Sequence, residues 1–214
     1  MANIAYPIHD IMSTIEKRHS DPERAQIRRN QVLEAAASCF RRSGFHGASM
    51  AEISKAAGMS AGHIYNYFDG KDAIIAAFVE QNVERVAALM HDLEQQDDPL
   101  QVMLNEAPIH LTENLAPEFW ALPMEIWAEA SRNPKIAAVL HDADHRSRTQ
   151  FRAIMKAGRE RHQLPVDDAL LDGRVEAIIA IFQGVSVRAL HHPELDRAAL
   201  EASCLLALKI LYFS

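Results

Sequence analysis

Apolar residues recur three or four positions apart along most of this chain, and no stretch alternates apolar and polar residues over a useful length. The first spacing places apolar side chains on one face of an α-helix, whereas a half-buried strand needs the alternation. Prolines and glycines fall between the periodic stretches and mark their ends. The pattern therefore predicts an all-α protein. The longer helices are expected at about 20–43, 70–96, 100–114, 117–132, 134–162, 167–191 and 195–212.

The first long helix has both a start signal and a stop signal. Ser20 and Glu23 have the spacing of a capping box, and Pro22 suits a first helical turn because its missing N–H costs nothing there. Gly44 supplies the left-handed stop. Residues 1–19 carry acidic side chains and no continuous apolar run, so we expect a flexible extension rather than a secretory signal or a membrane span. The inner face of the helix is expected to hold Ile27, Leu33, Ala36, Ala37 and Phe40.

Two short helices on a tight turn are predicted next. Ser49 is placed to cap the first, with Glu52 three residues later, and Ser60 is placed to cap the second. Gly58 tolerates the positive φ that the turn needs, and the small Ser54 lets the two helices approach closely. The arrangement is typical of a helix-turn-helix, although short helix pairs joined through glycine also occur as structural hairpins.

Charge is distributed unevenly along the chain. The formal net charge is -7, yet residues 1–72 carry nine basic and eight acidic side chains, against thirteen and twenty-one in residues 73–214. The average would argue against a nucleic-acid partner, but the first part alone does not. The two parts are therefore expected to face different partners.

Segment 60–72, with the sequence SAGHIYNYFDGKD, carries a specific motif. It resembles the recognition helix and following cap of the tetracycline-repressor (TetR) family of bacterial regulators, whose pattern is roughly Ser-x-Gly-x-hydrophobic-Tyr-x-Tyr/His-Phe-x-x-Lys-Glu/Asp. The likeness covers residues 24–80, and the stretch 119–134 looks like the effector domain of the betaine-regulator subgroup. The resemblance implies a helix-turn-helix DNA-binding domain at 20–72 and a helical ligand-binding and dimerisation domain at 73–214. It also implies a sequence-specific transcriptional regulator, a repressor that a small-molecule effector releases from double-stranded operator DNA.

The resemblance assigns DNA contacts to side chains in and around the second short helix. They are Ser49, Ser60, Ala61, Gly62, His63, Tyr65, Asn66, Tyr67 and Lys71. The two serines can bind phosphates through hydroxyl and backbone N–H groups while capping their helices. The tyrosines and the lysine match positions that hold the sugar-phosphate backbone, although one aromatic side chain can instead serve the small core and the lysine can be a solvated charge.

The remaining four residues occupy the groove-facing start of the recognition helix. Gly62 lets the backbone come close to the bases, Asn66 can pair with adenine, and His63 can donate to a guanine edge. Exposed His and Asn side chains are also often simply solvated. Ala61 and His63 depart from the family pattern, in which a basic residue and a small residue such as threonine are frequent. The groove-facing charge is therefore low.

Aromatic, methionine and acidic side chains cluster in the second part of the chain. The family likeness places them around an effector cavity, while ordinary core packing is the alternative that sequence cannot separate. The acidic balance, with Glu106, Glu113, Glu125 and Glu129 near two tryptophans, predicts a cationic, amphipathic effector, unless those carboxylates only face water. The residues assigned to effector binding are Met103, Phe119, Trp120, Met124, Glu125, Trp127, Phe151, Met155 and Phe182.

The last two helices carry more apolar positions than one shell of packing readily covers, which predicts a homodimer through them. An enzyme is the alternative function. His141 and His145 have the spacing of a shared metal site, so a metal-dependent helical hydrolase is weighed, but the glutamate of the hydrolase motif and a third ligand are missing. Cys39 and Cys204 are interpreted as core thiols in a cytoplasmic protein. We expect no catalytic residue, metal or cofactor.

Overall fold

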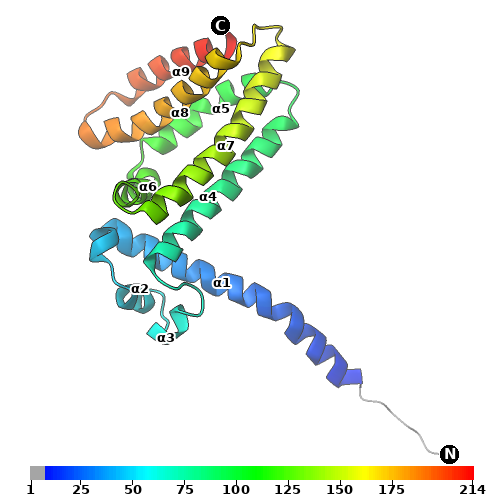
Figure 1. The fold of residues 1–214 in the computed structure, drawn as a ribbon, viewed down its shortest axis with the longest axis vertical. Helices are drawn as coiled ribbons and strands as arrows, with labels where there is room; N and C mark the ends of the chain where they lie inside the picture. Colours follow the sequence, from blue (N-terminus) through cyan, green and yellow to red (C-terminus); the bar gives the residue numbers. More distant parts are fainter. Residues whose placement is uncertain (1–7) are drawn as a thin grey trace, which may run out of the picture. The chain divides into compact units, whose positions relative to one another are not determined.

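The computed structural model describes the backbone of residues 8–214 and the side chains from residue 22 onward, and this part of the chain contains nine α-helices and no strand (Figure 1). It divides into two compact units, Met1–Ile74 and Ile75–Ser214. The all-α prediction is confirmed. Within the described residues, no helix is both long enough and apolar enough to cross a membrane.

The first unit contains α1 (Ile8–Gly47), α2 (Met50–Ala56), α3 (Ala61–Ile64) and the first turn of α4 (Lys71–Glu94). The predicted start of the first helix at Ser20 is wrong, because α1 begins at Ile8 and passes through Pro22. A proline inside a helix removes one backbone hydrogen bond but does not always end the helix. The predicted stop is confirmed, since Gly44 has the non-helical angles φ 70° and ψ 169°.

The core of the first unit forms where α1 meets α2 and the segment after α3. The buried side chains include Leu33, Phe40, Ile53, Ile64 and Phe68. The prediction that Ile27 belongs to the inner face of α1 is wrong, because 59% of this residue is exposed. Among the described residues of α1, buried apolar side chains begin at Val32, so the turn that carries Ile27 lies before the part of the helix that enters the core.

The second unit contains the rest of α4, then α5 (Pro99–Asn114), α6 (Pro117–Ala130), α7 (Pro134–Arg161), α8 (Asp168–His191) and α9 (Arg197–Phe213). These bounds lie within two residues of the predicted ones. Proline occupies the start of α5, α6 and α7, where its fixed φ suits a first turn. In Figure 1, α5, α7, α8 and α9 lie close together as a bundle.

The main core of this unit joins α5, α7, α8 and α9. Gly158 lets α7 approach α5, because a Cβ at this position would lie 2.6 Å from Cγ of Leu100. A smaller core cluster at the other end of α5 contains Leu111, Leu115 and Val185. The buried side chains of the main core are Leu100, Met103, Ala107, Phe151, Ile154, Met155, Leu171, Val175, Ile178, Leu208 and Tyr212.

Two arginines fix the last turn of α9. Arg159 is buried and donates to the carbonyl oxygens of Pro165, Tyr212 and Ser214. Arg174 donates to the Leu211 carbonyl at 2.8 Å. Burial lowers the pKa of Arg159, and the nearby Arg174 cation lowers it further. Cations suit the carboxyl end of a helix, where unpaired carbonyls gather, so these contacts hold α9 against α7 and α8.

Candidate DNA-binding and effector sites

The first short helix begins with the predicted capping box. The hydroxyl of Ser49 accepts a hydrogen bond from the backbone N–H of Glu52 at 3.1 Å, and the Ser49 N–H donates to the Glu52 carboxylate at 2.8 Å. These bonds from Ser49 lower the pKa of Glu52. Gly58 has a φ of 64°, so the turn between the two short helices uses the left-handed conformation that glycine favours.

The second short helix presents its first turn to solvent. The Ser60 hydroxyl accepts from the His63 N–H at 3.2 Å and thereby caps α3. Ala61, Gly62 and His63 are exposed, as is Asn66 just beyond the helix. No atom lies within 4 Å of the position that a Cβ on Gly62 would take, so packing does not require glycine there. The space beside the Gly62 backbone is therefore open.

The two tyrosines after α3 have different environments. Tyr65 is 51% exposed. Tyr67 is half-buried, and its hydroxyl lies 3.3 Å from Nε2 of His63, with the two ring centroids 5.4 Å apart. Phe68, rather than either tyrosine, fills the small core. The pairing restricts the His63 ring on the surface that the sequence assigned to base contact.

Lys71 is neither free nor fully solvated. Its ammonium donates to the carbonyl oxygens of Phe45 at 2.5 Å and Ala48 at 2.8 Å, and it lies 4.5 Å from the centroid of the Phe45 ring. These carbonyls belong to the end of α1 and the connection to α2. Two of the three N–H donors of Lys71 therefore join the start of α4 to the α1–α2 connection.

Two residues of α1 contribute in a way that the sequence did not single out. Arg29 donates to the Tyr67 carbonyl at 3.3 Å, and its guanidinium lies 4.3 Å from the centroid of the Phe68 ring. Gln31 donates to the Ala57 carbonyl at 2.6 Å. Both side chains tie the helix-turn-helix to α1. In sequence they appear as an ordinary polar helix face, because their partners lie 26 to 38 positions away.

The residues assigned to effector binding do not converge on one cavity. Met103, Phe151 and Met155 are buried in the main core, and Phe182 packs partly against both core clusters. On α6, Met124 and Glu125 are half-buried, whereas Phe119 and Trp127 are exposed by 50% and 38%. For the three core residues, packing gives a complete account of their position.

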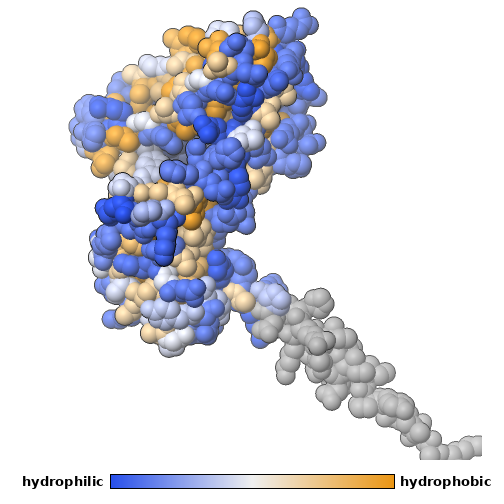
Figure 2. All heavy atoms as spheres, viewed as in Figure 1, coloured by the Kyte–Doolittle hydropathy of each residue, from blue (hydrophilic) through white to orange (hydrophobic). Residues whose placement is uncertain are grey.

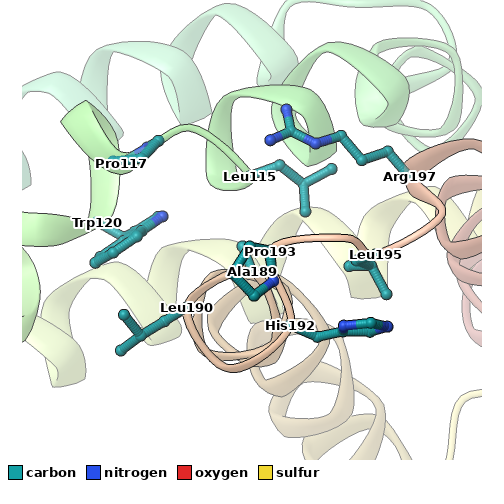
Figure 3. Close-up of a pocket in the computed structure, with 9 residues that line it drawn as sticks. All are labelled: Leu115, Pro117, Trp120, Ala189, Leu190, His192, Pro193, Leu195 and Arg197. Carbon is teal, nitrogen blue, oxygen red and sulfur yellow. The ribbon is translucent and has the colours of Figure 1, made fainter.

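Trp120 is the one residue of that set that lines the pocket shown in Figure 3. The pocket has a volume of about 270 Å³ and lies where the α5–α6 connection meets the end of α8 and the start of α9. We refer to it as the α8–α9 pocket. Its lining residues are Leu115, Pro117, Trp120, Ala189, Leu190, His192, Pro193, Leu195 and Arg197.

The acidic residues that suggested a cationic effector lie outside this pocket. Glu106, Glu113 and Glu125 are absent from its lining. Glu129 is buried on α6, where its carboxylate accepts from Nε of Arg132 at 2.9 Å. This carboxylate is engaged within the protein and has no access to the pocket.

The histidine pair considered for catalysis lies on the exposed side of α7. His141 and His145 are both exposed, and within the described residues no group of three His, Cys, Asp or Glu side chains is placed to hold a metal ion. The same stretch is rich in surface ion pairs, such as Arg146 with Asp142 at 3.0 Å and with Glu80 at 2.8 Å. Nothing in this geometry supports a hydrolase.

The fold and the exposed α3 surface define a helix-turn-helix DNA-binding protein with a separate helical domain. Residues 32–78 match the N-terminal domain of the bacterial regulatory proteins of the tetR family, and residues 110–211 match the C-terminal domain of BetI-type transcriptional repressors. The chain is 36% identical over 144 residues to the HTH-type transcriptional regulator UidR of Escherichia coli K12, covering 67% of this chain and 72% of that protein. The protein therefore belongs to the TetR family of transcriptional regulators.

Solved structures agree with this assignment. GusR of Salmonella enterica is 25% identical, with a TM-score of 0.71 over 86% of this chain and 95% of that one. FadR of Bacillus subtilis, solved in complex with stearoyl-CoA, is 17% identical, with a TM-score of 0.68 over 83% of this chain and 96% of that one. The second likeness concerns the fold alone. The predicted resemblance and the predicted class of function, a DNA-binding transcriptional regulator, are confirmed.

Proposed function

We propose that this protein is a repressor that binds a pseudo-palindromic operator as a homodimer and releases it when a small molecule occupies its second unit. The observation that carries the proposal is the exposed first turn of α3, held on a capped and tightly tied helix-turn-helix. A regulator of this kind acts where the chromosome lies, which in a bacterium is the cytoplasm.

The DNA contacts divide by chemistry. Ser49 and Ser60 stand at helix N-termini, where hydroxyl and N–H groups suit a phosphate, and the exposed Tyr65 suits the sugar-phosphate backbone. Asn66, with Ala61 and Gly62, forms the part of the surface that reads base edges in the major groove. His63 and Tyr67 act as a pair, because each restricts the side chain of the other.

Lys71 has a different part in this proposal from the one the sequence suggested. Its ammonium is engaged with the Phe45 and Ala48 carbonyls, so we assign it to positioning the start of α4. Its remaining donor can still reach a phosphate. The two contributions are separable by salt dependence, because only a phosphate contact releases counterions.

The homodimer uses the exposed apolar side chains of α8 and α9. Leu206 and Ile210, both on α9, are exposed by 63% and 54%, and Val187 on α8 by 37%. Figure 2 shows hydrophobic surface over these helices. Ile178 and Val185, two of the apolar residues of α8 on which the prediction of a homodimer rested, are buried in the core and serve packing instead.

Substitution of the exposed Leu206 tests the proposed interface without changing a core residue. Leu206→Asp is expected to give monomers by light scattering and to abolish operator binding, since a monomer meets only one half-site. Leu89→Asp, at an exposed leucine of α4, is the matched control and should remain dimeric. A fully dimeric Leu206→Asp would place the interface on another surface.

A gel shift with the DNA that flanks the gene of this protein tests the proposed function. Sequence-selective binding is expected at low salt, with affinity falling steeply as salt rises. Metal analysis of the purified protein, with His141→Ala as the control, tests the hydrolase alternative in parallel. Absence of selective binding at low salt would contradict the proposal.

A further inference from the structure

The α8–α9 pocket combines apolar walls with three nitrogen-bearing polar side chains. Leu115, Leu190 and Leu195 supply much of the apolar surface. The polar side chains among the lining residues are Arg197, the indole of Trp120 and the imidazole of His192, and no aspartate or glutamate is present. The lining therefore offers N–H donors, one cation and one imidazole, which can donate or accept, and it contains no carboxylate to balance the cation.

The guanidinium of Arg197 is available for a ligand. It has no hydrogen-bond or ion-pair partner within the described part of the chain. The neighbouring Asp196 is engaged elsewhere, because its carboxylate accepts from the Ala199 N–H at 3.0 Å and caps α9. In Figure 3 the Arg197 side chain extends over Leu115 toward the α5–α6 connection.

The indole N–H of Trp120 is buried and has no acceptor among the residues that the structure describes. Buried donors in proteins are almost always paired, so an unpaired one in a pocket wall calls for a partner. In Figure 3 the nitrogen end of the indole is the end nearer to the middle of the pocket. An acceptor atom inside the pocket would satisfy it.

The start of α6 adds a weaker positive potential, which Glu118 in its first turn offsets in part. Its N-cap residue is Ala116, which has no side-chain acceptor, and Pro117 in the first turn lines the pocket. The uncapped amino end of a helix carries a partial positive charge that favours anions. Arg197, the Trp120 N–H and this helix end all favour a negatively charged acceptor group.

We propose that the α8–α9 pocket binds a small amphipathic organic anion, a carboxylate on a short apolar body, and that this ligand is the effector. The carboxylate pairs with Arg197 and accepts from the Trp120 N–H, while the apolar body packs on the leucines. The volume of about 270 Å³ is small for a ligand site, since typical pockets span about 300–1,000 Å³. The effector class is thus opposite in charge to the one that the acidic composition suggested. The proposal rests on the proposed function only in that ligand binding weakens operator binding.

Three probes with the same apolar body, a phenyl ring on three methylenes, isolate the contribution of charge: 4-phenylbutyrate, 4-phenylbutyramide and 3-phenylpropylamine. Binding is measured by tryptophan fluorescence in a Trp127→Phe background, where Trp120 is the single tryptophan. The carboxylate should give a saturable change and bind more tightly than the amide, and the amine should bind most weakly. Tighter binding of the amine than of the carboxylate would overturn the proposal.

Two arginine variants test the contact itself. Arg197→Gln should weaken 4-phenylbutyrate binding by about tenfold to a hundredfold, the range expected for a lost charge-assisted hydrogen bond. Arg188→Gln, an exposed arginine of α8 outside the pocket, should leave it unchanged. Equal affinities of the two variants would contradict the assignment of Arg197.

A gel shift with and without 4-phenylbutyrate completes the test and keeps two failures apart. Selective operator binding without the probe, lost when the probe saturates the pocket, supports both the ligand class and its role as effector. Unchanged operator binding at a saturating concentration of the probe would overturn the effector role. Absence of operator binding without any probe would instead contradict the proposed function, while the fluorescence result on charge would stand.

Discussion

Replacement of Lys71 by methionine tests how the start of α4 is held against the other helices of the first unit. The change keeps most of the apolar stem and removes both hydrogen bonds to the Phe45 and Ala48 carbonyls. Hydrogen bonds that involve a charged group contribute about 1.5–3 kcal/mol each in protected sites, and an exposed cation–π contact about 0.5–1 kcal/mol. Lys71 is half-buried, and the three contacts share one ammonium, so their energies do not add.

We therefore expect Lys71→Met to lower the free energy of unfolding by about 2 kcal/mol, which for a chain of this size lowers the Tm by about 4–8 °C. Circular dichroism at 222 nm during heating measures the shift. Lys55→Met is the matched control, because Lys55 is an exposed lysine of α2 whose side chain has no hydrogen bond or ion pair among the described residues, and the Tm of this variant should not change.

Operator binding by the same variants separates positioning from phosphate contact. If Lys71 mainly positions α4, the slope of log Kd against log salt stays the same in Lys71→Met, although the affinity falls. A phosphate contact would reduce that slope by about one unit. An unchanged Tm combined with a reduced slope would refute the reasoning from the two carbonyl contacts.

Three further predictions follow from other contacts. Tyr65→Phe should weaken binding to all operator variants equally, whereas Asn66→Ala should also relax preference at one base pair, by about 1–3 kcal/mol, and equal losses on every sequence would make Asn66 a positioning residue. Gly158→Ala should lower stability to urea by about 1–3 kcal/mol because its Cβ would meet the buried Leu100, and the loss should shrink in a Leu100→Ala background, so an undiminished loss there would contradict the steric cause. The pKa of Glu52 is lowered in the folded protein, so the ionised carboxylate stabilises the fold fully above the pKa of an unfolded glutamate, and this stabilisation is lost as pH falls through the folded pKa. Between pH 5 and pH 3 the Tm of Glu52→Gln should therefore fall less than the Tm of the wild type. Parallel curves of Tm against pH would argue against this linkage.

Helix ends and caps that depend on local residues could be predicted from the sequence. Proline at the first position of α5, α6 and α7 fixes φ through its ring, and glycine at positions 44 and 58 permits the positive φ found there, so the helix bounds followed from these residues. Pro22 is the exception, because a long helix can absorb a proline. Ser49 and Ser60 were identified as caps for the same local reason.

Features that depend on residues far away in the sequence could not be predicted from it. Periodicity placed Ile27 on an apolar face but could not show that nothing covers that turn of α1. The engagement of Lys71 depends on carbonyls that lie 23 and 26 positions away. Methionines such as Met103 and Met155 occur both in pocket walls and in cores, so their sequence pattern does not distinguish the two. Only the tertiary arrangement places them in the core.

Selection of binding sites from random double-stranded DNA by the full-length protein tests the central claim most directly. Two recognition surfaces in a dimer meet successive major grooves, so the enriched sequences should contain an inverted repeat with half-site centres about 10–10.5 base pairs apart, or a multiple of that spacing. The Asn66→Ala variant should enrich the same repeat with one position in each half-site relaxed. Enrichment of no common sequence by the wild-type protein at low salt would contradict the account.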